Sequence, residues 1–406
     1  MNILLRKIKS LFVRIGIAIK KCFAAVGRAR SLAFAKKQCR AALREKQPSL
    51  PPPDWKAQFD VFLPDRGRSE TEFGFLEPPS VDLSVIVAAY NVEPYVKECI
   101  HSVLRQETKY NMEVIVVNDG STDGTKEQLA ADLTDPRLRY YEQENAGQAA
   151  ARNFAILHSR GRYLMVLDAD DLLTPGSIDF LMNLAVKTQS EIVEGAILRF
   201  HGNFAPPEQK RVKTKTLEGA AKDNYILTSY GYSVAKIYRR ELWENVRYPV
   251  GYIFEDVISK FVLRRLAKRI TVTDRLVYGY RWSPNSSSHG KIEKKALDSI
   301  LVFPHIAQSC VQNGVSNDRV FYLLALNHIG VLNHYTTAPF AEKERNLCFW
   351  ALREQLMAIQ NCKKGKLPFW FSLLEKAILT GNFTGWNLVA NTIRQYNRAA
   401  KYREIN

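Results

Sequence analysis

Between residues 83 and 171 the chain alternates short apolar runs with segments of helical spacing, and this alternation limits the fold more than any other feature. The runs are rich in β-branched residues and fit buried strands: Leu83–Ala89, Val114–Val117, Leu138–Tyr141 and Tyr163–Leu167. In the segment 93–106, apolar residues recur at steps of three and four, as in a helix. Strands that alternate with helices predict an α/β fold, with a doubly wound, mostly parallel sheet flanked by helices.

Polar residues follow three of these strands. Ala89-Tyr90-Asn91 ends the first run, Asn118-Asp119-Gly120 ends the second, and Asp168-Ala169-Asp170-Asp171 ends the fourth. In an open parallel sheet, ligands bind beyond the carboxyl ends of the strands. We therefore expect the three polar groups to meet at one ligand-binding edge of the sheet.

The acidic run 168–171 makes the most specific prediction. Neighbouring carboxylates repel one another unless a cation joins them, and oxygen ligands of this kind suit Mg²⁺ or Mn²⁺ bound to substrate phosphates. In an extended segment, Asp168 and Asp170 would point to the same face and could share a ligand. The alternative is a helix cap, with Asp170 or Asp171 ahead of a helix that begins near Pro175.

A second carboxylate pair, Glu255-Asp256, follows the turn at Pro249–Gly251 and precedes an apolar helical run. By itself, an acidic pair at the start of a helix is usually a capping and dipole feature. The pair becomes a candidate for function only in combination with the other polar groups.

The order of these segments resembles the family-2 glycosyltransferases, which have the nucleotide-binding GT-A fold. The resemblance covers about half of the chain and rests on five motifs: Ser84–Asn91, Val116–Thr125, Asn145–Asn153, Leu167–Asp171 and Phe254–Asp256. The chain departs from the family at Ala88, where the first motif usually has proline. This departure removes no chemical group.

The resemblance implies roles in holding a nucleotide-sugar. Tyr90 would lie against the uracil or ribose, Asp119 would accept hydrogen bonds from the uracil edge, and Arg152 would face the base and diphosphate. Asp168 would bind the ribose, and Asp170 would hold a divalent cation, Mn²⁺ or Mg²⁺, that bridges the phosphates. The other positions expected to contact the nucleotide are Ala89, Asn91, Glu93, Gly120, Gln148 and Ala169.

The resemblance also implies the catalytic group. Asp256 would be the general base that takes the proton of the acceptor hydroxyl during a single, inverting displacement, because a nearby carboxylate can accept that proton. Glu255 would tune Asp256 or bind the acceptor.

Three further stretches are weaker candidates. Ser233–Tyr238, which contains Lys236, resembles the segment that lies before the acceptor side in the family. Tyr280–Trp282 and Asn285–His289 resemble the loop that closes over the diphosphate, which makes Arg281 a phosphate candidate and His289 a metal candidate. Asp171 and Lys236 are candidates for phosphate or acceptor contact. The alternative for Lys236 is an ordinary surface lysine.

The charge of the chain is concentrated at its start. Residues 1–46 hold 13 of the 58 Lys and Arg residues and a single acid. Residues 1–47 are expected to form a basic amphipathic arm that lies on an anionic membrane surface, or alternatively a solvated helix packed on the protein. Because the basic excess lies outside the core, nucleic-acid binding is disfavoured.

The structure expected for the remaining regions is inferred from their composition and residue pattern. Residues 48–80 are rich in proline and are expected to form a linker or a wrapping segment. Residues 81–290 would form the GT-A domain, and residues 291–406 an α-helical region. No stretch is long and apolar enough for a transmembrane helix, and the six scattered cysteines fit a reducing compartment.

Together these features predict a glycosyltransferase, of the hexosyltransferase type, that moves a sugar from a UDP-sugar to a hydroxyl of a glycan or glycolipid. It would act in surface polysaccharide or lipopolysaccharide synthesis, as a peripheral protein on the cytoplasmic side of a bacterial inner membrane. A nucleotidyltransferase would show a phosphate loop rich in Gly and basic residues after the first strand, which is absent. A catalytically inactive membrane-associated nucleotide-binding scaffold is the other alternative, but both Asp170 and Asp256 are present.

Overall fold

The computed structural model of the chain describes residues 36–37, 39–41, 43, 51–65, 67, 72–130, 132–209, 211–282, 297–332 and 340–404. Of these, the side chains of 331–332 and 394–404 are not described. The basic arm before residue 36 and the stretch that contains His289 therefore lie outside the described residues.

A mixed sheet forms one half of the described molecule, and its order is β3-β2-β1-β4-β8-β6-β9-β5, with β7 beside β9. The first four strands in sequence are parallel neighbours, as expected: β1 Val81–Ala89, β2 Met112–Asn118, β3 Leu138–Glu142 and β4 Gly161–Asp168. The other strands are β5 Leu172–Leu173, β6 Ile192–Phe200, β7 Thr214–Leu217, β8 Lys236–Arg239 and β9 Ile270–Arg281. Since β8 runs antiparallel to both β4 and β6, the sheet is parallel in its first half and mixed in its second.

Helices cover both faces of the sheet, and the alternation of side chains along β1 shows how. Leu83, Val85 and Val87 share a core with the helices α3 and α6, whereas Ile86 shares the opposite core with α5. Such alternation is the period of two that a strand buried on both faces requires. The helices of this half are α3 Val96–Leu104, α4 Thr125–Leu129, α5 Gln148–Leu157 and α6 Ser177–Thr188.

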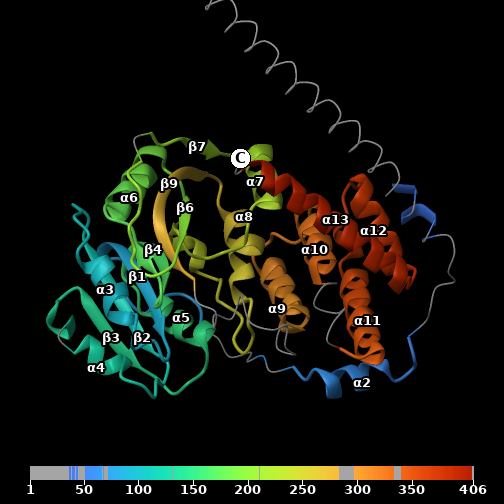
Figure 1. Cartoon of the computed structure of the whole chain (residues 1–406), viewed down its shortest axis with the longest axis horizontal. Coiled ribbons are helices and arrows are strands. Elements are labelled where there is room, and N and C mark those ends of the chain that lie inside the picture. The colour runs from blue at the N-terminus through green and yellow to red at the C-terminus, as the bar shows by residue number, and fades with distance from the viewer. Residues whose placement is uncertain are drawn as a thin grey trace, which may run out of the picture.

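A block of helices forms the other half of the molecule (Figure 1). It contains α9 Asp298–Gln312, α10 Arg319–Leu332, α11 Glu342–Ala358, α12 Phe369–Leu379 and α13 Phe383–Glu404. Between the halves lie α7 Gly219–Thr228 and the short α8 Arg264–Leu266. One hydrophobic core runs from Ile86 through Trp243 and Phe261 to Leu324, so the helical block packs continuously onto one face of the sheet.

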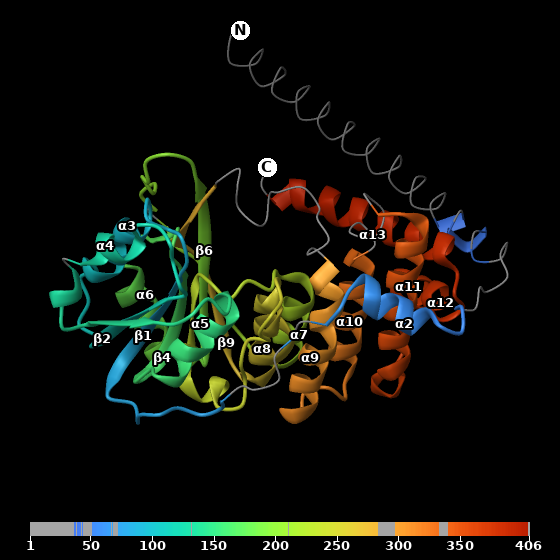
Figure 2. The same ribbon diagram turned by 90° about the horizontal axis from the view of Figure 1, so that it is seen from below.

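The described part of the proline-rich segment contacts both halves of the molecule. The helix α2 Trp55–Phe62 lies along the helical block beside α11 in both views (Figure 1 and Figure 2). Further along, Leu76 donates its backbone N–H to Leu157 O at 2.9 Å, and the Arg240 guanidinium lies 3.5 Å from the ring centre of Phe75. Within the described part of the chain, no helix combines the length and apolar character that crossing a bilayer requires.

Candidate functional site

The carboxyl ends of β1, β2 and β4 lie side by side. In the sheet, Ala89 pairs with Asn118 of β2, and Ala88 pairs with Asp168 of β4. Because β1 stands between the other two strands, the polar groups that follow them share one edge. The strand order therefore brings together the three clusters that the sequence placed at strand ends.

The residues after β1 are used mainly to build the loop. Ala89 is fully buried, and its carbonyl accepts the Asp119 N–H at 2.8 Å. The Asn91 side chain accepts the Thr122 N–H at 2.8 Å, and Glu93 accepts the Gly124 N–H at 3.0 Å. These side chains therefore tie the first loop to the second, and the expected contacts of Asn91 and Glu93 with the nucleotide stay a prediction. The ring of Tyr90, in contrast, is 49% exposed.

Asp119 is buried beneath the loop that precedes α5. Its carboxylate accepts hydrogen bonds from Gln143 Nε2 at 2.7 Å and from the backbone N–H groups of Ala146 at 2.9 Å and Gly147 at 2.8 Å. A carboxylate has about four acceptor positions, so about one remains for a base. The main chain of Gly120 passes close to this loop, since a β-carbon there would lie 2.8 Å from Asn145 N.

Arg152 joins the two acidic groups of the site. Its guanidinium is nearly inaccessible and bonds Asp168 and Glu255, each at 2.6 Å. In its better-satisfied amide orientation, Gln148 accepts from Arg152 at 2.8 Å and donates to Glu255 at 3.3 Å. The guanidinium is thus held between two carboxylates, and its expected contact with the base and diphosphate stays a prediction.

The acidic run does not continue as an extended segment. The strand β4 ends at Asp168, Ala169 and Asp170 form a turn, and the Asp171 N–H bonds Asp168 O at 3.0 Å. The expectation that alternation along a strand places Asp168 and Asp170 on one face is therefore wrong. The helix-cap alternative is also wrong, because α6 begins at Ser177 after Gly176 and has no side-chain cap.

The three acids have different surroundings. Asp171 is buried and accepts hydrogen bonds from Tyr278 OH and from the Arg281 N–H, both at 2.7 Å. No described residue other than Asp170 itself donates a hydrogen bond to the Asp170 carboxyl. Burial and the neighbouring Asp168 raise the pKa of Asp170 to about 6. Burial, followed by Asp168 and Asp170, also raises the pKa of Asp171.

The Arg281 side chain bonds the acidic run and a neighbouring glutamate. Its Nε donates to Asp170 O at 2.9 Å, and its Nη2 bonds Glu98 at 2.6 Å. Arg281 and Asp171 thus hold the turn that presents Asp170.

The acidic edge suits a divalent cation that is completed by substrate oxygens. The described residues contain no cluster of three or more His, Cys, Asp or Glu side chains that would form an all-protein metal site. Mg²⁺ usually keeps several waters and takes one or two carboxylates together with substrate phosphates. The Asp170 carboxyl accepts no hydrogen bond from another described residue, and its pKa is raised by burial and next by Asp168, so it fits that kind of site.

Glu255 and Asp256 lie in a 3₁₀ turn, Glu255–Val257, that follows an uncommon backbone conformation. Phe254 has a φ of +69°, in the left-handed region that a bulky residue rarely adopts. Such conformations often mark functional sites. Burial, and next the Glu255 carboxylate, raises the pKa of Asp256 to about 7, while Arg152 opposes this effect.

Lys236 is buried, which overturns its interpretation as a surface lysine. Its Nζ donates to Val234 O at 2.7 Å and lies 3.6 Å from Glu194. Its expected contact with a phosphate or the acceptor stays a prediction. The fully buried Arg264 forms two hydrogen bonds to the same Glu194, at 2.8 and 3.0 Å. Burial lowers the pKa of Lys236 to about 8.

Sequence reasoning missed this buried ionic group of Glu194, Lys236 and Arg264. One signal was present, because Glu194 interrupts the apolar run of β6. A charged residue within a buried strand requires a partner. The partners come from segments 42 and 70 residues away, however, so only the fold reveals them.

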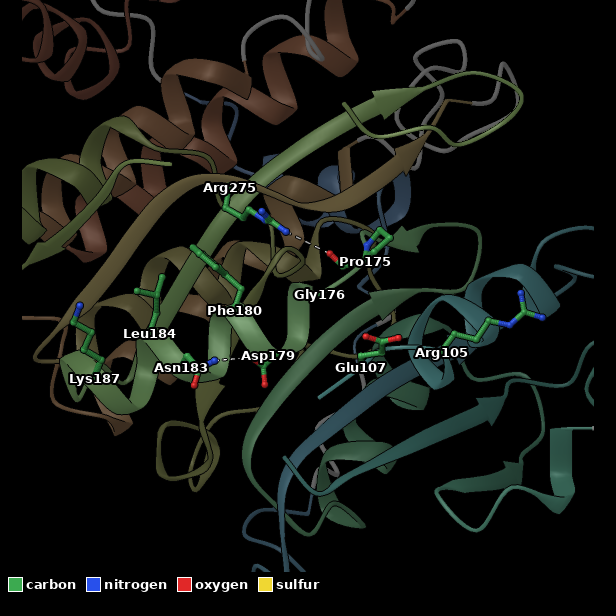
Figure 3. A pocket seen from close by; sticks show the side chains of 10 residues that line it. All are labelled: Arg105, Glu107, Pro175, Gly176, Asp179, Phe180, Asn183, Leu184, Lys187 and Arg275. Carbon is green, nitrogen blue, oxygen red and sulfur yellow. Dashed lines mark hydrogen bonds between the residues drawn. The ribbon is translucent and has the colours of Figure 1, made fainter. Parts of the chain in front are cut away.

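A cavity of about 620 Å³ lies apart from these strand ends, beside α6 and the end of α3 (Figure 3). Asp179 and Asn183 in its wall bond each other at 2.6 Å, and Arg275 is turned toward Pro175 O at 3.5 Å. None of the expected site residues lines it. The candidate site is therefore the strand edge and not this cavity.

Comparison with known proteins agrees with the fold. Residues 84–247 match the sequence profile of Glycosyl transferase family 2. The chain is 36% identical over 219 residues to the uncharacterized glycosyltransferase EpsJ of Bacillus subtilis, a match that covers 50% of this chain and 62% of EpsJ. It is 30% identical over 244 residues to the putative glycosyltransferase EpsH of the same organism, covering 56% of this chain and 67% of EpsH. The chain thus spans less than two thirds of EpsJ.

Crystal structures of S. aureus TarS, residues 1–349, have the same fold. The complex with UDP has a TM-score of 0.57 and 19% identity, and the match covers 77% of this chain and 91% of that one. The complex with UDP-GlcNAc has a TM-score of 0.58 and 20% identity. The motif order, the strand-end geometry and these relatives lead to one conclusion: the chain belongs to the family-2 glycosyltransferases and has the GT-A fold.

Proposed function

We propose that this chain transfers a sugar from a UDP-sugar to a hydroxyl of a glycan or glycolipid in cell-surface polysaccharide synthesis. The observation that carries the proposal is the Arg152 bridge, which ties Asp168 at the end of β4 to the Glu255–Asp256 turn. One buried guanidinium thereby links the expected donor side to the turn that carries the expected catalytic carboxylate, Asp256. The binding of UDP and UDP-GlcNAc by TarS supports the choice of donor.

On the donor side, the exposed ring of Tyr90 is suited to lie against uracil, because a base stacks well on an aromatic face. The remaining acceptor position of Asp119 is suited to the uracil N–H. Asp168 keeps a second carboxylate oxygen for the ribose hydroxyls, since Arg152 bonds Oδ1. Asp170 would hold Mn²⁺ or Mg²⁺, which neutralises the charge that develops on the leaving diphosphate.

On the acceptor side, Asp256 is the proposed general base. As the acceptor oxygen forms its bond to the anomeric carbon, the hydroxyl proton passes to the Asp256 carboxylate. The bond between the anomeric carbon and the diphosphate oxygen breaks in the same step, and its electron pair leaves with the diphosphate. Because the acceptor attacks the face opposite the leaving group, the configuration inverts. A pKa of about 7 places Asp256 close to the operating pH, where a general base is most effective.

The basic N-terminal arm would keep the enzyme on an anionic membrane surface, on the cytoplasmic side of the bacterial inner membrane. Its 13 basic residues support that placement, since each contributes about 1 kcal/mol near anionic headgroups. A lipid-linked acceptor would then be within reach of the protein.

Calorimetric titration of UDP, GDP and dTDP, with and without Mn²⁺, tests the proposal. We expect UDP to bind selectively and only with Mn²⁺, and we expect Asp170→Asn to lose this Mn²⁺-dependent binding. Folded protein that binds none of the three nucleotides would refute the proposed function. Tight Mn²⁺-dependent UDP binding by Asp170→Asn would refute the metal assignment alone.

A further inference from the structure

Two half-exposed tyrosines stand on the loop between α7 and β8. Tyr230 is 52% exposed and Tyr232 is 40% exposed. Their rings are stacked, with centroids 5.3 Å apart and an angle of 14° between the planes. Large aromatic side chains are normally covered, so a stacked pair at the surface calls for an explanation.

The backbone that carries this pair is held by two cations, the half-buried Lys260 and the fully buried Arg264. Lys260 Nζ donates to Ser229 O at 2.6 Å, and Arg264 Nη1 donates to Tyr230 O at 2.7 Å. Arg264 is itself fixed by its two bonds to Glu194. The rings are therefore exposed on a rigid base and not on a loosely held loop, which lowers the entropy lost when they bind a ligand.

The loop also lies directly beside the proposed general base. Ser233 Oγ donates to the backbone oxygen of Asp256 at 3.4 Å. A β-carbon on Gly231 would lie 3.8 Å from Val257 Cα and 3.4 Å from Lys260 Cβ, so the main chain of the loop rests on the segment after Asp256. Residues on both sides of Tyr232 thus touch the catalytic segment.

The electrostatics of Tyr232 agree with this placement. Partial burial raises the pKa of its phenol, and the Asp256 carboxylate acts in the same direction, while Arg199 opposes it. The exposed Arg199 lies over the Tyr280 ring at 5.7 Å from its centre. Arg199 thus adds hydrogen-bond donors beside the aromatic pair.

We propose that Tyr230 and Tyr232 form an aromatic platform that binds the pyranose ring of the acceptor and turns its hydroxyl toward Asp256. A pyranose has an apolar C–H face and polar edges. Its C–H face matches the apolar face of an aromatic ring, and its polar edges suit neighbouring hydrogen-bonding groups. This inference rests on the proposed function and adds the element that selects the acceptor.

Saturation-transfer NMR on the full-length protein, with UDP and Mn²⁺ at saturation, tests the platform. The probes are methyl β-glucopyranoside, methyl β-galactopyranoside and methyl N-acetyl-β-glucosaminide. We expect at least one glycoside to bind, with the strongest saturation on the protons of its C–H face. Tyr230→Ala and Tyr232→Ala should each weaken that binding at least about tenfold, and Tyr230→Phe should retain it. Phe73→Ala, which removes an exposed aromatic side chain elsewhere, is the matched control.

The UDP affinity of every variant separates the two proposals. Unchanged UDP binding, together with lost glycoside binding, supports the platform. If no glycoside binds to the wild type, or if the alanine variants bind as well as the wild type, the platform is wrong and the proposed function stands. If the alanine variants lose affinity for anionic vesicles instead, the tyrosines are membrane contacts. Absence of UDP binding by the wild type would refute the proposed function itself.

Discussion

At the residue scale, the carboxylates of the site differ in whether a positive charge is paired with them. Arg152 balances Asp168 and Glu255, whereas Asp170 and Asp256 lack a comparable ion pair among the described side chains. The same two groups show raised pKa values. This contrast agrees with the proposal that Asp170 binds a cation and that Asp256 accepts a proton.

Asp256→Asn should remove transfer and also stabilise the protein. Transfer is expected to fall about 10²- to 10⁴-fold, the usual contribution of a general base, while the Kd for UDP stays unchanged. The pKa of Asp256 is raised from 3.8 to about 7, so the folded protein holds this proton more tightly than the unfolded chain does. Stability is therefore lost as the pH rises from 3.8 to about 7. The neutral amide avoids that penalty, and Tm at pH 8 should therefore rise. Near-normal transfer by the variant would remove Asp256 as the base.

The same pKa predicts the pH dependence of the wild type. Because the base must be ionised, kcat/KM should fall about tenfold per pH unit below about pH 7 and level off above it. Initial rates measured from pH 5 to 9, at constant ionic strength, check this. An acidic limb that breaks near pH 4 would show that Asp256 is not perturbed in the way proposed.

Arg152→Ala should destabilise the fold, because it leaves the carboxylates of Asp168 and Glu255 without their buried ion-pair partner. Removing one partner of a buried ion pair typically lowers the free energy of unfolding by about 3–5 kcal/mol. The measurement is the free energy of unfolding in urea. Arg240→Ala is a suitable comparison, since that buried arginine donates to two backbone carbonyls and leaves no carboxylate unpaired. Equal losses in the two variants would argue against the bridge.

At the scale of elements, short loops at the ends of β1, β2 and β4 form the site by bonding one another. The loop after β1 is tied to the loop after β2 through Asn91 and Glu93, and Asp119 ties the second loop to the start of α5. The sequence indicated the strands and the polar clusters correctly. It did not indicate that several of these polar side chains bond within the loops, because such bonds join segments about 30 residues apart.

Gly120→Ala tests how tightly these loops are packed. Gly120 has a φ of +71°, and an added β-carbon would lie 2.8 Å from Asn145 N, so the alanine variant should suffer both backbone strain and a clash. Gly314→Ala is the matched control, because its φ is +69° and nothing lies within 4 Å of its added β-carbon. We expect Gly120→Ala to lower the free energy of unfolding by about 1–3 kcal/mol more than the control does, and to weaken UDP binding. Equal effects would show that the loop can move aside.

At the scale of the whole molecule, the sheet and the helical block share one continuous core, in which Phe261 packs near Phe303 and Phe321. The expected boundary at residue 290, between the GT-A domain and the helical region, stays a prediction. Physically, the two regions are closely packed on each other, and the helical block supports the segment that follows Asp256.

Deletion of residues 1–35 should release the protein from vesicles that contain anionic lipid. The deletion spares Cys39, which is buried and faces Thr392 at 3.8 Å, so the fold should be retained. Co-sedimentation with vesicles of neutral and of mixed neutral and anionic lipid, at two salt concentrations, measures the effect. Equal binding by the full and shortened chains would place the membrane contact elsewhere.

The sequence by itself determined the class of fold, the strands that carry the site and the family, because hydrophobic periodicity and short motifs are local properties. The partners of the charged groups were decided only by the tertiary structure. Arg152 finds Glu255 across 103 residues, and Arg264 finds Glu194 across 70. Burial, which sets the pKa of Asp256 and hides Lys236, depends on how sheet and helices pack. Local patterns do not encode such long-range proximity, so these properties emerge only when the chain is folded.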